Sequence, residues 1–289
     1  MKIGFIGLGS LGTPIAINLK ESGHELYVYN RTVSKTAPLA AKGAIVCKDV
    51  AALAKEASIV FTIVSDDAAI KAVSEELTSS LAEGSIHVSM STILPETAKI
   101  LAELHSAKGL HYLASPVFGR PEAAMARKLN FVISGNETVR KKIEPLLKDA
   151  GAAGVFDFGD TITAANTVKL CGNFLIASAL EAIGESAAMA NKSGVDANAM
   201  WAMFSQTLFN TPLYQNYSNI ILKQQFEPAA FTAKLGLKDM NLVLQQAASV
   251  DQTMPLAELL KRNMQQLTLN GKSGIDWSAV SLGGQLVKE

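Results

Sequence analysis

Three glycines near the start of the chain have the spacing of a phosphate-binding turn. Gly7, Gly9 and Gly12 follow an apolar run and precede a stretch with helical periodicity. In such a G-x-G-x-x-G turn the first glycine permits a tight bend, the second lets backbone N–H groups approach a pyrophosphate, and the third allows a helix and a strand to pack closely. We therefore expect a dinucleotide site rather than a chance glycine-rich turn, formed by Gly7, Leu8, Gly9, Ser10, Leu11 and Gly12.

The residues after the second expected strand indicate which dinucleotide would bind. An NAD site places Asp or Glu about 20 residues beyond the glycines, but this chain has Asn30, followed by Arg31, Thr32 and Lys35. A carboxylate would repel a 2′-phosphate, whereas Asn30 can bond a ribose and Arg31 can pair with a phosphate through two N–H groups. We expect NADP (NADPH); the alternative is that Arg31 and Lys35 only decorate a solvated helix start.

A polar stripe interrupts an apolar, alanine-rich stretch in the middle of the chain. Lys169 and Asn173 are four residues apart and Asn166 precedes Lys169 by three, so the three share one face of a helix. Hydride reduction of a carbonyl places negative charge on oxygen and needs a positioned proton donor. Partial desolvation brings the pKa of a lysine toward neutrality, which suits that task. The alternative is an ordinary solvated helix face.

The elements that must position these residues change character along the chain. Strands alternate with helices up to about Gly159, which predicts a parallel sheet covered on both faces. We expect strands at 2–7, 25–29, near Ile45, and at 58–64, 85–89, 111–114 and 131–134, with helices through about Ser22, at 35–42 and at 50–56.

The second half of the chain has helical patterns throughout. We expect a long helix over 161–191 and further helices after Asp196 and at 211–224, 235–248 and 255–269. The fold class is thus α/β, a doubly wound domain at 1–160 followed by an all-α domain at 161–289. Residues 161–191 would be the interdomain helix, at a junction where ligands usually bind.

Composition excludes several classes of protein. The 26 Lys and Arg residues balance 26 Asp and Glu residues, so no overall field attracts nucleic acid or an anionic membrane. Two cysteines cannot form a disulfide framework and four scattered histidines do not suggest a metal site. We expect a cytoplasmic protein with no signal peptide at residues 3–19, because four glycines and Pro14 interrupt that stretch. Apolar helix faces predict a homodimer or homotetramer.

Motifs occur in order along the chain at 3–12, 30–32, 90–92, Pro95, 115–120, Lys169, Asn173, 231–239 and 276–279. Together they resemble the β-hydroxyacid dehydrogenase family, which includes 3-hydroxyisobutyrate dehydrogenase, tartronate semialdehyde reductase and glyoxylate/succinic semialdehyde reductase. The resemblance implies a Rossmann-type domain, a helical C-terminal domain, and reversible hydride transfer between a nicotinamide and a small hydroxy acid, aldehyde or keto acid. Lys169 resembles the catalytic lysine, the general acid and base. The similar residues are spread over nearly the whole chain.

The same resemblance implies further site residues. Ordinary roles stay open for some of them: helix capping for Ser91 and Thr92, a surface position for Lys238, and a structural role for Asp276. The resemblance assigns Val64, Ser65, Thr92 and Lys238 to the cofactor, and Ser91, Phe118, Gly119, Arg120 and Asn173 to the substrate.

Departures from the family pattern concern the substrate. Phe118 stands where the family has a serine that grips a carboxylate, and Arg120 stands where it has a glycine. Arg120 would replace the lost donor, or Phe118 would line a pocket for more apolar substrates. Thr163 and Ala165 also replace two glycines before Lys169. The alternative functions are an imine reductase on the same fold, in whose relatives another residue generally replaces the lysine, and a non-catalytic dinucleotide sensor or scaffold.

Overall fold

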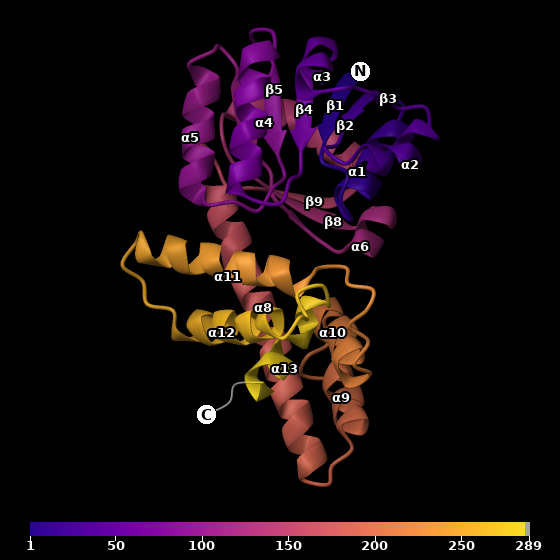
Figure 1. Cartoon of the computed structure of the whole chain (residues 1–289), viewed down its shortest axis with the longest axis vertical. Helices are drawn as coiled ribbons and strands as arrows, with labels where there is room; N and C mark the ends of the chain where they lie inside the picture. The colour runs from indigo at the N-terminus through magenta and orange to yellow at the C-terminus, as the bar shows by residue number, and fades with distance from the viewer. Residues whose placement is uncertain (287–289) are drawn as a thin grey trace. The chain divides into compact units, whose positions relative to one another are not determined.

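A computed structural model describes residues 1–286 of the chain (Figure 1). The chain forms two units, Met1–Lys169 and the chain from Leu170 onward, and the boundary falls inside helix α8 (Ala164–Lys192). This boundary, after Lys169, lies nine residues beyond the one expected after residue 160. The α8 helix passes a length and hydropathy criterion for crossing a membrane, as core helices also do, and 44% of its apolar window is buried.

The first unit is built on a six-stranded parallel sheet. Its strand order is β3-β2-β1-β4-β5-β6: the chain extends the sheet from β1 to β3 in one direction, then returns once to the other side of β1 and extends it from β4 to β6. This order is that of the dinucleotide-binding doubly wound fold, so the expected fold class is confirmed. The strands are β1 (Lys2–Ile6), β2 (Glu25–Tyr29), β3 (Ile45–Val46), β4 (Ile59–Thr62), β5 (Ile86–Ser89) and β6 (His111–Ala114).

Alternating side chains of the strands are buried on both faces of this sheet. Phe5 of β1 packs in a cluster with Ile15 of α1, whereas Ile6 packs in another cluster with Leu53 of α3. Burial on both faces explains why the strands are apolar runs rather than alternating ones. The helices are α1 (Gly12–Glu21), α2 (Ala37–Ala40), α3 (Val50–Glu56), α4 (Asp67–Ser80), α5 (Pro95–Ser106), α6 (Pro121–Met125) and α7 (Glu137–Asp149) (Figure 1).

One expectation for this unit was wrong and another was confirmed only in part. The strand expected at 131–134 does not join the parallel sheet; it is β8 (Leu129–Ile133), in a separate sheet between β7 (Val117–Phe118) and β9 (Ala152–Asp157). Strand periodicity identifies a strand but not its partner, and β7 pairs antiparallel with β8. The helix expected at 35–42 is a 3₁₀ turn, Val33–Thr36, followed by α2, because Pro38 starts a new helix.

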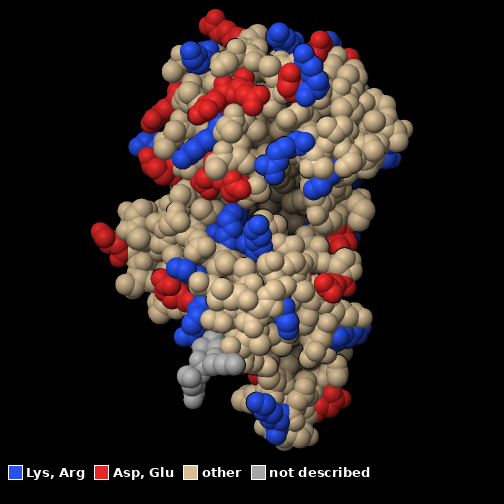
Figure 2. Space-filling view, viewed as in Figure 1, with Lys and Arg blue, Asp and Glu red and all other residues tan. Residues whose placement is uncertain are grey.

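The described part of the second unit is helical apart from one isolated backbone bridge between Thr232 and Asp276. Glycines let its helices approach closely: a Cβ at Gly283 would lie 2.0 Å from the carbonyl oxygen of Asn263. Besides α8, the helices are α9 (Ala197–Gln206), α10 (Pro212–Leu222), α11 (Ala233–Ala248), α12 (Pro255–Leu269), a 3₁₀ turn (Trp277–Ala279) and α13 (Val280–Gln285). Figure 2 shows Lys and Arg side chains interspersed with Asp and Glu on the viewed face, as zero net charge suggests.

Candidate functional site

The glycine turn has the geometry that its spacing predicts. Gly7 has a φ of +100°, a conformation that suits glycine, and a Cβ there would lie 2.1 Å from the carbonyl oxygen of Ile63. A Cβ at Gly12 would lie 2.0 Å from the carbonyl oxygen of Gly7, so this glycine is required for α1 to pack against the turn. Gly9 is exposed and has open space at its Cβ position. The turn and the start of α1 thus have the backbone geometry typical of a phosphate-binding turn, with no acidic side chain in the first turn of the helix.

Asn30 connects the glycine turn to the segment after β2. Its Oδ1 accepts a hydrogen bond from the backbone N–H of Leu8 at 2.8 Å, and its Nδ2 donates to the carbonyl oxygen of Thr32 at 2.8 Å. These bonds order both segments around the end of β2. Arg31 and Lys35 lie exposed beside this connection, and Thr32 precedes the 3₁₀ turn.

The remaining predicted cofactor residues of the first unit follow β4 and β5 at the carboxyl edge of the sheet. Val64 donates its backbone N–H to Oγ of Ser91 at 2.9 Å, so these two strand ends are joined. Ser65 donates its hydroxyl to Asp66, the N-cap of α4. Thr92, the residue after Ser91, is half-buried. These residues therefore share the sheet edge at which doubly wound folds bind ligands.

Phe118 and Lys169 are in contact in the structure. They lie 51 residues apart in the sequence, so their spacing did not predict this contact. The Nζ of Lys169 lies 4.0 Å from the centroid of the Phe118 ring. Lys169 is only 8% exposed, so the solvated-face alternative does not describe it. An ammonium group over an aromatic face gains a cation–π interaction, which is stronger when water is excluded. The contact places the predicted proton donor against the loop predicted to recognise substrate.

Gly119 and Arg120 complete that loop. Gly119 has a φ of +143°, and a Cβ there would lie 2.4 Å from a side-chain methyl group of Leu129, so glycine is required at this position. Arg120 precedes α6, and its Nε lies 3.7 Å from a carboxylate oxygen of Glu122. The Arg120 side chain is 25% exposed. The guanidinium is therefore neither sealed in the core nor fully solvated.

In the second unit, Asn173 and Lys238 converge on a carboxylate that sequence reasoning did not single out as a site residue. Asp239 is fully buried and accepts a hydrogen bond from Nδ2 of Asn173 at 2.5 Å, and its other oxygen lies 2.8 Å from Nζ of Lys238. The sequence held one signal for it, since Asp239 follows Lys238 directly in a motif of the resemblance. Asp239 fixes the amide of Asn173 and brings Lys238 beside it.

Asp276 has the structural role that was left open. Its Oδ2 accepts backbone N–H groups of Ala230 and Phe231 at 3.2 and 3.3 Å, and its Oδ1 accepts the hydroxyl of Ser278 at 2.7 Å. The carboxylate thereby joins the start of the last 3₁₀ turn to the segment that leads into α11.

Comparisons with known proteins cover both units of the chain. Residues 2–166 match the family model described as the NAD binding domain of 6-phosphogluconate dehydrogenase, and residues 163–281 match the model described as "NAD-binding of NADP-dependent 3-hydroxyisobutyrate dehydrogenase". An uncharacterized oxidoreductase of Bacillus subtilis (strain 168) is 42% identical, over 97% of this chain and 98% of that protein.

Two further proteins extend the comparison. The 2-hydroxy-3-oxopropionate reductase of Escherichia coli (strain K12) is 29% identical over 97% of this chain and 96% of its own length. The structure of Mycobacterium tuberculosis 3-hydroxyisobutyrate dehydrogenase with L-serine has a TM-score of 0.88 at 23% identity, covering 97% of this chain and 98% of that one. The similarity thus spans both units, and at that identity the structural match concerns the fold alone.

Proposed function

Because the chain belongs to the β-hydroxyacid dehydrogenase family, we propose that it is an NADP-dependent oxidoreductase of small hydroxy acids or of the matching aldehydes and keto acids. Membership of this family supports an oxidoreductase that acts on CH–OH groups with a nicotinamide cofactor. The proposal goes further in naming the cofactor, the general acid and the substrate class. The observation that carries it is the buried ammonium group of Lys169 against Phe118.

The cofactor preference rests on charge after β2. Asn30 uses its carbonyl oxygen on Leu8, and no carboxylate follows it before Asp49, so nothing close in sequence repels a 2′-phosphate. Arg31 and Lys35 are exposed and supply the matching positive charge. NADP is therefore favoured over NAD. The residues suited to hold it are those of the glycine turn, followed by Asn30, Arg31, Thr32, Lys35, Val64, Ser65 and Thr92.

Lys169 is the proposed general acid and base. The bound cofactor supplies the hydride in reduction and accepts it in oxidation. In reduction, Nζ of Lys169 donates a proton to the oxygen that gains negative charge, and in oxidation it takes a proton from the hydroxyl group. Burial removes competing water from the ammonium, which strengthens its stabilisation of that oxygen. The Phe118 ring restricts where the ammonium lies.

Arg120 is the proposed partner of a substrate carboxylate. The loop lacks the serine that grips a carboxylate in the family pattern, and a carboxylate taken out of water without a partner is costly. Arg120 lies two residues from Phe118, and its planar N–H groups match a carboxylate. Its side chain has to leave Glu122, a 3.7 Å contact with a well-exposed carboxylate, to do so. We propose Ser91 and Asn173 as further substrate contacts and Lys238 as a cofactor contact.

A spectrophotometric screen tests the proposed function. NADPH oxidation is followed with succinic semialdehyde, a keto acid, a neutral aliphatic aldehyde and a cyclic imine. We expect turnover with the acids, and turnover with NADPH to exceed that with NADH. Turnover of the imine alone would replace carbonyl reduction by imine reduction, and NADPH binding without any turnover would favour a dinucleotide sensor.

We also propose that the protein acts in the cytoplasm as a homodimer or homotetramer, on small molecules rather than on nucleic acid or membranes. Exposed apolar side chains on α8, such as Leu175 and Met189, are 66% and 68% exposed and support association. Light scattering after size-exclusion chromatography should give two or four times the chain mass of 30.6 kDa. A mass equal to one chain at micromolar concentration would contradict the proposed assembly.

A further inference from the structure

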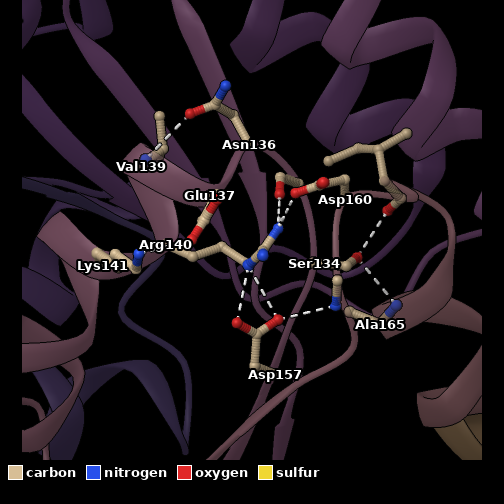
Figure 3. Close-up of polar contacts among 12 residues, drawn as sticks. Ser134, Asn136, Glu137, Val139, Arg140, Lys141, Asp157, Asp160 and Ala165 are labelled. Carbon is tan, nitrogen blue, oxygen red and sulfur yellow. Dashed lines mark hydrogen bonds and ion pairs between the residues drawn. The ribbon is translucent and has the colours of Figure 1, made fainter.

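The segment that leads from β9 into α8 is held at two points by side chains from outside it (Figure 3). Arg140 of α7 contacts Asp157 through Nε at 2.9 Å and Asp160 through Nη1 at 2.6 Å, and it also donates to the carbonyl oxygen of Gly135. Ser134, which directly follows β8, provides the second point. Figure 3 shows its side chain directed to the start of α8.

The Ser134 hydroxyl makes two hydrogen bonds at that point. Its Oγ donates to the carbonyl oxygen of Ile162 at 3.0 Å and accepts the backbone N–H of Ala165 at 3.0 Å. Ala165 is the second residue of α8, so its N–H has no acceptor within the helix. Both Ser134 and Ala165 are fully buried. A residue far away in sequence therefore caps α8 where a local N-cap side chain usually does so.

The backbone of Ser134 is also joined to the loop that carries Phe118. Ser134 and Ala114 exchange two backbone hydrogen bonds, at 3.1 and 3.2 Å, in an isolated antiparallel bridge. Four residues after Ala114 comes Phe118, whose strand β7 pairs with β8. One residue thus contacts both the start of the helix that carries Lys169 and the strand end that leads to the ring beneath it.

From these contacts we infer that Ser134 is a positioning residue, whose hydroxyl sets the start of α8 and so holds the Lys169 ammonium at the Phe118 ring. Lys169 lies one helical turn beyond Ala165, so a shift of the first turn moves its side chain directly. Without the hydroxyl, the N–H of Ala165 and the carbonyl of Ile162 lose their shared partner, and the helix start has to move to satisfy them. The inference rests on the proposed role of Lys169 as proton donor.

Steady-state kinetics of a double-mutant cycle test this role. Ser134→Ala should lower kcat about tenfold with little change in NADPH affinity, since misplacement of a catalytic group by about 1 Å has effects of this order or larger. In a Lys169→Ala background the same change should have less than about a twofold effect, because the group that Ser134 positions is gone. Equal effects in both backgrounds would show a general structural role and overturn the inference.

Three further variants control the kinetics. Thr167→Val removes a hydroxyl of the same helix that donates to the carbonyl oxygen of Thr163, just before the helix, and should leave kcat nearly unchanged. Ser134→Thr keeps the hydroxyl and should restore most of the activity. Ser134→Cys, a weak hydrogen-bonding group of similar size, replaces the alanine variant if that one does not fold. Activity of Lys169→Ala at the wild-type level would instead refute the proposed function itself.

A second measurement reports the position of Lys169 without a substrate. In protein labelled with ¹³C at the lysine Cε, the Lys169 signal is identified by its absence in Lys169→Arg. The aromatic ring current should shift this signal away from those of other lysines. Ser134→Ala should move it back toward them, whereas Thr167→Val should not. An unchanged Lys169 signal in folded Ser134→Ala would overturn the inference.

Discussion

The ammonium nitrogen of Lys169 lies 4.0 Å from the centroid of the Phe118 ring. The two residues come from different elements, α8 and β7, and meet inside the first unit. Phe118 occupies the position where the family pattern has a carboxylate-gripping serine. Its substitution therefore does more than remove a hydroxyl donor, because the ring also forms the surface against which the proposed general acid is held.

Removing the ring while keeping an apolar side chain should impair turnover. A cation–π contact contributes about 0.5–2 kcal/mol, so Phe118→Leu should lower kcat by roughly twofold to thirtyfold if that contact holds Lys169 in place. Phe118→Tyr, which keeps an aromatic face, is the matched control and should stay close to wild type. Stopped-flow measurement of the hydride-transfer step compares the two. Equal rates for the leucine variant and wild type would exclude a positioning role for the ring.

Loss of the Arg120 guanidinium should affect acidic substrates selectively. Arg120→Ala should raise KM for succinic semialdehyde by about tenfold or more, a loss of about 1.4 kcal/mol, since a charge-assisted hydrogen bond is removed. KM for a neutral aldehyde of similar length should change much less. The ratio of the two KM values, in wild type and variant, is the measurement. An unchanged ratio would mean that Arg120 does not bind substrate and that Phe118 lines a pocket for apolar compounds.

Charge reversal after β2 should change the choice of cofactor. Wild type should prefer NADPH by roughly tenfold to a hundredfold in kcat/KM, because charged hydrogen bonds contribute about 1.5–3 kcal/mol. Arg31→Glu should remove this preference or reverse it by repelling the 2′-phosphate. Lys128→Glu, at an exposed lysine outside the segment after β2, controls for net charge. Equal kcat/KM for NADPH and NADH in wild type would contradict the assignment of NADP.

Two buried histidines should make the protein less stable in acid. His105 donates from Nδ1 to the carbonyl oxygen of Leu101 at 2.7 Å, so its Nε2 is an acceptor for Nδ1–H of His87 at 3.0 Å. Nε2 of His87 in turn accepts the hydroxyl proton of Thr62 at 2.8 Å. Every ring nitrogen is used when both histidines are neutral, and burial and His105 hold the pKa of His87 well below its usual 6.5.

The sign of the pH effect follows from that depressed pKa. The unfolded chain binds a proton below about pH 6.5 while the folded chain does not, so stability is lost as pH falls below that value. Urea unfolding should give a free energy of unfolding about 1 kcal/mol or more lower at pH 5.5 than at pH 7.5. His87→Gln should show a smaller pH dependence, and His111→Gln, at an exposed histidine, should keep that of wild type. Equal slopes for all three proteins would refute the role of His87.

The sequence was most informative where a local pattern has only one structural solution. The turn at 7–12 requires glycine both for a positive φ at Gly7 and for the close approach at Gly12, so the glycine spacing between an apolar run and a helical pattern located it. The helix at Val50–Glu56 was predicted to the residue, and in the structure Asp49 caps its start by accepting the N–H of Ala52. The alternation of strand and helix patterns similarly predicted the parallel sheet.

Features that depend on partners distant in sequence could not be predicted. Strand β8 has the pattern of any buried strand, and only the fold shows that it pairs with β7 and β9. Phe118 contacts Lys169 from a separate element. Ser134 likewise caps α8 from outside that helix. In the sequence, Asp239 stood out only because it follows Lys238. Its hydrogen bond with Asn173 is known only from the structure. Contacts between side chains of distant elements leave no periodic pattern in the sequence, so they could not be predicted from it.

The central claim is that Lys169 moves the proton in a hydride-transfer reaction, and single-turnover kinetics of Lys169→Ala test it most directly. With NADPH and the best carbonyl substrate, the rate of NADPH oxidation should fall by about 10²–10⁴, the usual contribution of a positioned general acid, while NADPH binding stays within about twofold of wild type. Lys234→Ala, at an exposed lysine of α11, should behave as wild type. Wild-type single-turnover rates in Lys169→Ala would contradict the claim.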